Sequence, residues 1–224
     1  MSKIDEILNE MHAVADAAKL ESMARFGIQP VKGLGLNTPQ IREIARRAGK
    51  NQHLAEQLWA TGIHEARILA AMVGDPQLIT RATMDRWTRD FASWGVCDAC
   101  CYDLFDRSPH AWSMIPKWAA HNREFVRRAA FATIAAIAIH DKKADDEIFL
   151  NALPLIEKYA FDERNFVRKG VNWALRNIGK RNPALGIAAI ACAERIRAQN
   201  TKAARWIAAD ALRELRRKYQ VKSE

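Results

Sequence analysis

The chain has 224 residues, of which 49% are hydrophobic, and it carries a formal net charge of +9. With only 10 Gly and 7 Pro it has too few turn residues for an all-β fold. No apolar run reaches the roughly 18 residues that a membrane helix needs, and Met1–Glu6 lacks the apolar core of a signal peptide. A cytoplasmic protein with a polyanionic partner, most often nucleic acid, is therefore expected.

Apolar residues recur at helical spacing along the chain, and no alternating stretch is long enough to be a strand. A first helix is expected at 3–25, followed by a glycine-rich loop. Thr38 is expected to cap the next helix, with Pro39 at its first position and Gly49 after its end. Further helices are expected at 51–61, 63–73, 77–91, 95–106, 109–121, 124–140, 145–160, 165–178, 184–199 and 202–219. This pattern predicts a single all-α domain over residues 1–224, with about twelve helices paired antiparallel.

A short motif recurs near the start of five predicted helices. The five copies are Ala66-Arg67-Ile68, Val96-Cys97-Asp98, Val126-Arg127-Arg128, Val167-Arg168-Lys169 and Ala204-Arg205-Trp206. Successive copies lie 30, 30, 41 and 37 residues apart. Helical repeats of this length are typical of stacked helix pairs of the HEAT or armadillo kind. We therefore expect an α-solenoid of about six antiparallel helix pairs.

The third residues of the copies should form a column along a concave surface, because a solenoid aligns equivalent positions. That column is Ile68, Asp98, Arg128, Lys169 and Trp206. Trp94 lies one helical turn before Asp98, and Trp173 and Arg176 follow Lys169 on one helix. The sequence therefore predicts a basic concave groove with two indoles beside a carboxylate. Cations and aromatic rings together suit the binding of a nucleic-acid backbone.

Structural roles compete with this interpretation. Tryptophans at helical spacing are commonly core residues, and four of them fit apolar helix faces: Trp59, Trp87, Trp112 and Trp118. An Asp near a helix start commonly caps the helix or interacts with its dipole. Arg127 and Arg168 are candidates for ion pairs between repeats. The shared register of the column, rather than any single residue, favours the functional interpretation.

The four cysteines are expected to be reduced thiols. Cys97, Cys100 and Cys101 share one helix face, which is typical of small core residues. Cys192 and His110 do not supply a second ligand pair at zinc spacing, so no metal site is predicted. Nothing in the sequence indicates a nucleotide cofactor, and none is predicted.

Several elements in order resemble one known family. Ser93-Trp94-Gly95-Val96-Cys97-Asp98 is followed by Phe125-Val126-Arg127-Arg128-Ala129-Ala130 and by Val171-Asn172-Trp173-Ala174-Leu175-Arg176. Leu34–Pro39 precedes them, and Lys180–Pro183 follows them. In this order they resemble the bacterial HEAT-repeat alkylpurine DNA glycosylases, the AlkD-like DNA alkylation repair proteins. The resemblance runs from about Leu34 to Pro183.

This resemblance implies a role for each cleft residue. Asp98 falls on the family's catalytic aspartate. Trp94 and Trp173 fall on the two tryptophans that hold the backbone and sugar of the damaged nucleotide. Arg128 falls on the cleft arginine. Phe26 falls on a cleft aromatic that is usually Tyr, so that the ring is kept and the hydroxyl is lost.

The implied reaction is N-glycosidic cleavage of a cationic 3- or 7-alkylpurine in duplex DNA. Because alkylation already makes the base a good leaving group, no general acid is needed. A carboxylate near C1′ would stabilise the oxocarbenium-like transition state and orient or deprotonate the attacking water. Arg128, Lys169 and Arg176 would neutralise phosphates. A monomer that binds double-stranded DNA carrying alkylated bases, without a membrane or a cofactor, is expected.

Two other functions are compatible with the same sequence. One is a non-catalytic DNA-binding protein for distorted duplexes or junctions, in which Asp98 would be idle. The other is a HEAT-type scaffold for an acidic protein partner, because a fold does not by itself imply a function.

Overall fold

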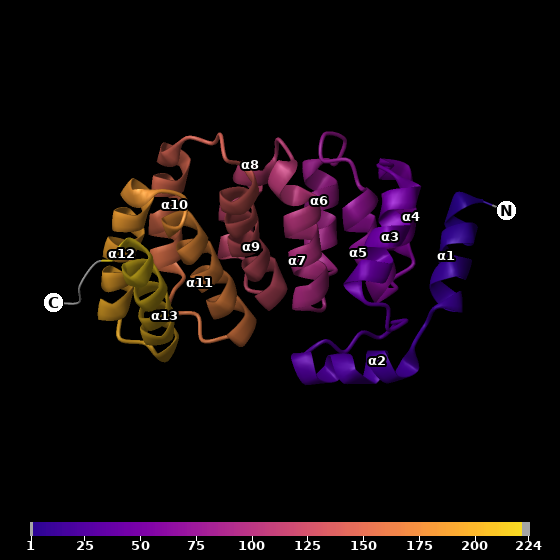
Figure 1. The fold of residues 1–224 in the computed structure, drawn as a ribbon, viewed down its shortest axis with the longest axis horizontal. Coiled ribbons are helices and arrows are strands. Elements are labelled where there is room, and N and C mark those ends of the chain that lie inside the picture. Colours follow the sequence, from indigo (N-terminus) through magenta and orange to yellow (C-terminus); the bar gives the residue numbers. More distant parts are fainter. Residues whose placement is uncertain (1, 221–224) are drawn as a thin grey trace. The chain divides into compact units, whose positions relative to one another are not determined.

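The computed structural model describes residues 2–220, and in that range it contains thirteen α-helices, two short 3₁₀ helices and no strand. Figure 1 labels the helices. They form two compact units, Met1–His110 and Ala111–Glu224, each of which is described by itself. The prediction of an all-α chain is confirmed, while the assignment of residues 1–224 to one domain stays a prediction.

Within residues 2–110, the first unit contains seven α-helices and two 3₁₀ helices. Its elements are α1 (Lys3–Ala13), α2 (Ala17–Met23), η1 (Ala24–Phe26), α3 (Thr38–Ala48), α4 (Gln52–Ala60), α5 (His64–Val73), α6 (Arg81–Arg89), α7 (Trp94–Asp103) and η2 (Phe105–Arg107). Helix α5 packs between α3 and α7, and α4 packs against α5 and α1. Trp59 of α4 stacks on Trp87 of α6 with ring centroids 4.1 Å apart, and this contact joins the two helices.

The start of this unit differs from the prediction in two places. The helix expected at 3–25 is broken, because the Asp16 N–H donates to the Leu34 carbonyl at 2.8 Å and Asp16 then caps α2. Asn37, not Thr38, caps α3. The Asn37 amide oxygen accepts from the Gln40 N–H at 3.0 Å, and the Gln40 side chain accepts from the Asn37 N–H at 2.9 Å. This reciprocal pair is a capping box, and it satisfies two backbone donors at the helix start.

Within residues 111–220, the second unit contains six α-helices, most of which are longer than those of the first unit. They are α8 (Ala111–Ala120), α9 (Glu124–His140), α10 (Asp146–Lys158), α11 (Asn165–Gly179), α12 (Pro183–Ala198) and α13 (Lys202–Tyr219). Helix α11 packs between α9 and α13, while α10 packs against α12 and α8 against α9 (Figure 1). Helices α9, α11 and α13 each pack against the helix that precedes them in the chain, as the predicted helix pairs require.

The core contains the residues that the helical spacing assigned to it. Trp87, Trp118 and all four cysteines have no exposed surface, and Trp59 is 4% exposed. Burial raises the pKa of the Cys192 thiol to about 12 and holds that of Cys100 well above its usual value. These thiols therefore remain protonated and serve as small core side chains.

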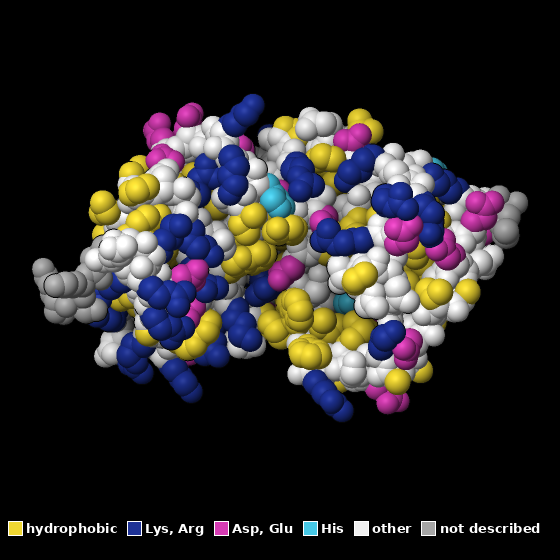
Figure 2. All heavy atoms as spheres, in the orientation of Figure 1, with side chains coloured by type: hydrophobic (Ala, Val, Ile, Leu, Met, Phe, Trp, Pro, Cys, Tyr) yellow, Lys and Arg dark blue, Asp and Glu magenta, His cyan; other side chains and the backbone are white. Residues whose placement is uncertain are grey.

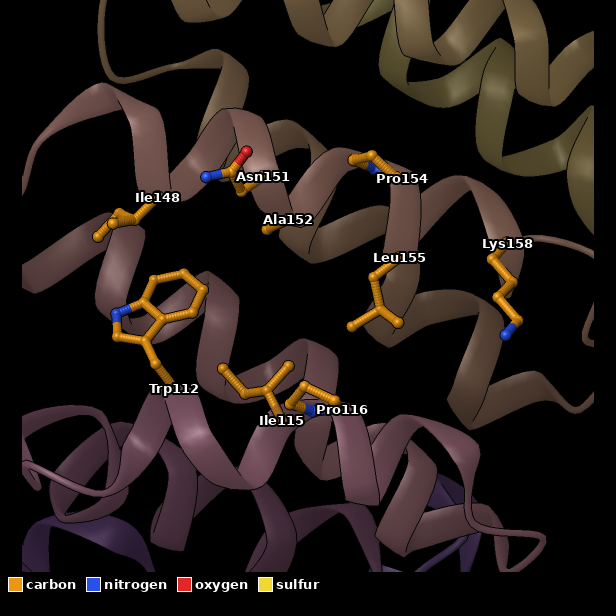
Figure 3. Close-up of a pocket in the computed structure, with 9 residues that line it drawn as sticks. All are labelled: Trp112, Ile115, Pro116, Ile148, Asn151, Ala152, Pro154, Leu155 and Lys158. Carbon is orange, nitrogen blue, oxygen red and sulfur yellow. The ribbon is translucent and has the colours of Figure 1, made fainter.

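Trp112 is the one tryptophan of that group that stays half-buried. It lines a groove of about 400 Å³ between α8 and α10 (Figure 3). Pro116 and Pro154, which lie inside these two helices, line the same groove. None of the predicted site residues of this unit lines it.

An arginine at the second position of the repeated motif ties helices together in the first unit. The Arg67 guanidinium lies over the Trp59 ring, with Cζ 5.0 Å from the ring centroid. It also reaches the Asp90 carboxylate at 3.8 Å and donates to the Asp90 carbonyl at 3.2 Å. Asp90 follows α6, so this arginine joins α5 to the next helix pair.

Arg127 repeats this arrangement in the second unit. Its Cζ lies 4.9 Å from the centroid of the Tyr159 ring, and its Nη1 donates to the Asp162 carboxylate at 2.6 Å. Asp162 follows α10, so the ion pair again reaches the next helix pair, as predicted. The same prediction is wrong for Arg168, which has no carboxylate partner among residues 2–220.

Candidate functional site

The repeated motif has the same place in all five helices that carry it. Each copy begins at the third residue of α5, α7, α9, α11 or α13, so the predicted column occupies the fifth residue of each helix. The first residue of every copy is buried, which fixes how each helix faces its neighbours. The copies are Ala66, Val96, Val126, Val167 and Ala204. The register predicted from the 30- to 41-residue steps is thus kept within each unit.

The start of α7 presents Trp94 and Asp98 on one face. Ser93 caps the helix, because its hydroxyl accepts from the Val96 N–H at 3.4 Å. Trp94 is the first residue and Asp98 the fifth, so their side chains lie one turn apart. Both are half-buried.

Trp94 also joins α7 to the predicted cleft aromatic. Its Nε1 donates to the Phe26 carbonyl at 2.8 Å, across 68 residues of sequence. The Phe26 ring itself is 66% exposed, so the backbone of Phe26 is held while its ring remains open to a ligand. The structure therefore brings Trp94 to the backbone of Phe26 at the start of α7, one turn before Asp98.

His64 packs beside this site, and the sequence assigned it no role. A side chain added at Gly95 would meet the His64 ring at 3.6 Å, so the ring lies against the first turn of α7. Burial and the nearby Arg67 charge lower the pKa of His64 although Glu65 opposes them, which leaves the imidazole neutral near pH 7. The repeat could have indicated His64, because it lies 30 residues before Trp94 and both are the first residue of their helix.

The loop that follows Phe26 is fixed by a buried carboxylate. Glu65 has no exposed surface, and its two oxygens accept from the Leu34 N–H at 2.9 Å and the Gly35 N–H at 2.8 Å. Gly35 has φ of +76°, and a Cβ there would lie 2.0 Å from the Asp16 carbonyl oxygen. Only glycine fits this close approach. The contacts with Glu65 and Asp16 thus fix the position of this loop.

In the second unit, Arg128 is buried between α9 and α11. It is 6% exposed, and its Nη1 donates to the Phe166 carbonyl at 2.6 Å. A Cβ at Gly170 would lie 3.4 Å from Arg128 Cγ, so the small residue leaves room for the arginine stem. Arg128 is therefore held in a fixed orientation, and its contact with a phosphate stays a prediction.

Lys169 and Trp173 lie one turn apart on α11. Lys169 is exposed, whereas Trp173 is half-buried and its carbonyl accepts from the Asn177 side chain at 2.8 Å. The cation thus stands at the start of α11 with an indole behind it. This composition suits a sugar–phosphate backbone, because the ammonium can pair with phosphate and the ring can contact deoxyribose.

Arg176 is bound to carboxylates of α13. Its Nη1 lies 2.5 Å from Glu214 Oε2 and 3.5 Å from Asp210 Oδ2. Burial acts to raise the pKa of Glu214, but hydrogen bonds and charges from Lys180 and Arg176 outweigh it, so that this pKa is lowered. The guanidinium therefore joins α11 to α13, and the predicted phosphate contact of Arg176 stays a prediction.

Among residues 2–220 no group of His, Cys, Asp and Glu side chains is placed to hold a metal ion. No helix in the same range combines the length and apolar character that crossing a bilayer requires.

Comparison with known proteins gives a family and a fold. A family model described as "DNA alkylation repair enzyme" matches residues 7–215. A solved structure is similar over 95% of both chains, with a TM-score of 0.77 and 18% sequence identity. It is described as "a new family of proteins related to the HEAT-like repeat DNA glycosylases with affinity for branched DNA structures". A search of curated proteins found no match.

Proposed function

The chain belongs to the DNA alkylation repair enzyme family, and on this basis we propose that it is a DNA glycosylase for cationic alkylated purines. Its substrates would be bases of the 3-methyladenine and 7-methylguanine type in duplex DNA. The observation that carries the proposal is the start of α7, where Asp98 and Trp94 lie one turn apart and Trp94 binds the backbone carbonyl of the exposed Phe26. A carboxylate beside aromatic rings suits a transition state with positive charge.

Each residue has a role in the proposed reaction. Asp98 stabilises the charge that develops on the deoxyribose and orients the water that attacks C1′. Trp94 and Trp173 hold the sugar and backbone of the damaged nucleotide. Because the alkylated base leaves as a neutral purine, the site needs no proton donor for it. This explains why one carboxylate is enough where ordinary glycoside hydrolysis uses two.

The cations of the second unit hold the duplex in this proposal. Lys169 pairs with a phosphate, and Arg128 presents a guanidinium whose orientation is already fixed by the Phe166 carbonyl. Arg176, which already pairs with Glu214 of α13, is the third cation proposed to meet a phosphate. The cytoplasm is the proposed location, where the four buried thiols stay reduced, and the monomer is the proposed active form.

Replacement of Lys169 tests the proposed phosphate contact directly. We expect Lys169→Ala to weaken binding of every duplex sequence. The plot of log affinity against log salt concentration should become shallower by about 0.9, because the variant releases one counterion fewer from the DNA. Fluorescence anisotropy with a labelled undamaged duplex measures both quantities. An unchanged slope would show that Lys169 contacts no phosphate.

The proposed activity is tested by base release from randomly methylated duplex DNA. The expected result is free 7-methylguanine and 3-methyladenine in amounts that grow with enzyme concentration. Tight duplex binding without base release would favour the non-catalytic alternative, which is consistent with the branched-DNA affinity described for the similar structure. Absence of DNA binding at moderate salt would favour a protein-interaction scaffold.

A further inference from the structure

The last repeat lacks the acid that the earlier repeats place opposite their second-position arginine. Arg67 and Arg127 reach Asp90 and Asp162, each of which follows the first helix of the next pair. The corresponding segment after α12 contains Asn200 instead. Residues 195–209 hold four Lys or Arg and no Asp or Glu.

Asn200 offers Arg168 no carboxylate, and its single side-chain oxygen already accepts from Arg205. Arg205 Nη1 donates to the Asn200 carbonyl and to its side-chain oxygen, both at 2.8 Å. Arg168 donates instead to the Asn165 side-chain oxygen at 3.2 Å, a neutral acceptor, and its Nε is buried without a partner among residues 2–220. A half-buried guanidinium with only one neutral acceptor retains much of its capacity to bind an anion.

The orientation of Arg168 is fixed by an aromatic ring. Its Cζ lies 5.0 Å from the centroid of the Trp206 ring, and Trp206 is itself 38% exposed. Trp206 is the column residue of α13, equivalent to Lys169 on α11. Stacking on an indole fixes the plane of a guanidinium and leaves its edge free to donate hydrogen bonds.

The surroundings of this pair are positive. Lys169 and Lys202 are exposed, and neither has a carboxylate within ion-pair distance in the described range. Two acids at this end are already bound to backbone: Glu124 accepts from the Phe166 N–H at 3.1 Å, and Glu163 accepts from the Ala203 N–H at 2.9 Å. On the face drawn in Figure 2, Lys and Arg side chains gather over α11 and α13.

We infer that Arg168 and Trp206 form a binding site for a phosphodiester of DNA, separate from the nucleotide that reacts. Arg168 donates to the phosphate oxygens, Lys169 and Lys202 add positive charge, and the exposed part of the Trp206 ring contacts the adjoining deoxyribose. The inference rests on the proposed function in taking DNA as the ligand. It extends the DNA-binding surface to the last repeat, where the family resemblance assigned no residue.

The test uses two substitutions, one that removes the Arg168 side chain and one that keeps it. Arg168→Ala removes the guanidinium. Asn200→Asp keeps Arg168 in place and supplies a second anionic oxygen, beyond the one that Arg205 binds, at the position where Asp90 and Asp162 stand in two earlier repeats. Both are expected to weaken binding of a labelled duplex about 3–10-fold and to make its salt slope shallower by about 0.9, measured between about 50 and 200 mM salt. If Arg168 were only structural, Asn200→Asp would leave binding unchanged or would stabilise the fold alone.

Arg195→Ala is the matched control, because Arg195 is an exposed arginine of α12 that already pairs with Glu157 at 2.8 Å. It should retain the affinity and salt slope of the unmodified chain. The inference is overturned if Arg168→Ala and Asn200→Asp both bind like the unmodified chain. If the unmodified chain binds no DNA, the proposed function fails and this site fails with it. If base release is absent while both variants lose affinity, only the proposed catalysis fails.

Discussion

Asp98→Asn is expected to lower the rate of 7-methylguanine release by at least about 100-fold and to leave duplex affinity within a few-fold of the unmodified chain. Asparagine keeps the size and hydrogen-bonding shape of the side chain, but it removes the negative charge that would stabilise the oxocarbenium-like sugar. It also removes the base that would take a proton from the attacking water. Binding should persist, because Lys169 and the other cations hold the phosphates.

Single-turnover release from methylated DNA and anisotropy with undamaged duplex give the two readouts for this substitution. Asp145→Asn is a suitable control, since Asp145 is exposed before α10 and its side chain makes no cap hydrogen bond. It changes the net charge by the same amount and should release bases at the unmodified rate. Release by Asp98→Asn at that rate would remove Asp98 from the catalytic role.

Asp162→Asn is expected to lower the free energy of unfolding by about 3–5 kcal/mol at pH 7, because it leaves buried charges without their partner. Asp162 is 5% exposed and accepts from Arg127 Nη1 at 2.6 Å and Arg164 Nη2 at 2.5 Å. Those arginines also donate to the carbonyls of Ala119 and Asn122. Urea unfolding of the two proteins at neutral pH measures the difference.

The pH dependence of this difference follows from the pKa of Asp162. Burial acts to raise it, but the hydrogen bonds from Arg164 and Arg127 outweigh burial, so the folded-state pKa lies below its usual value. The stabilisation is therefore complete above the unfolded pKa of about 3.9 and is lost as pH falls through the lower folded pKa. The gap between Asp162→Asn and the unmodified chain should narrow in that acidic window. A gap that widened there would contradict this assignment.

Local sequence patterns predicted the helices well and their boundaries less well. Most predicted helices coincide with observed ones to within a few residues, because apolar spacing is local information. The errors arise where distant groups decide. The break at Asp16 depends on the Leu34 carbonyl, and the helix expected at 77–91 begins only at Arg81, after the Thr80 cap.

The candidate site was predicted through its register rather than its contacts. The repeat placed Asp98, Arg128 and Lys169 at equivalent helix positions, and each is the fifth residue of its helix. The hydrogen bond from Trp94 to Phe26 spans 68 residues and leaves no trace in local spacing. The ion pairs of Arg176 with α13 likewise depend on how two helices pack. Whether these residues act on DNA stays a prediction.

The carboxylates that close the helix starts of the second unit have a consequence for its cooperativity. Glu124 holds the Phe166 amide of the next pair, and Glu163 does the same for Ala203. If one helix pair opened, the glutamate and the backbone amide that are bonded to each other would both lose their partner. Local fraying is coupled to the adjacent pair in this way, and the stack of α8 to α13 gains resistance to piecemeal melting.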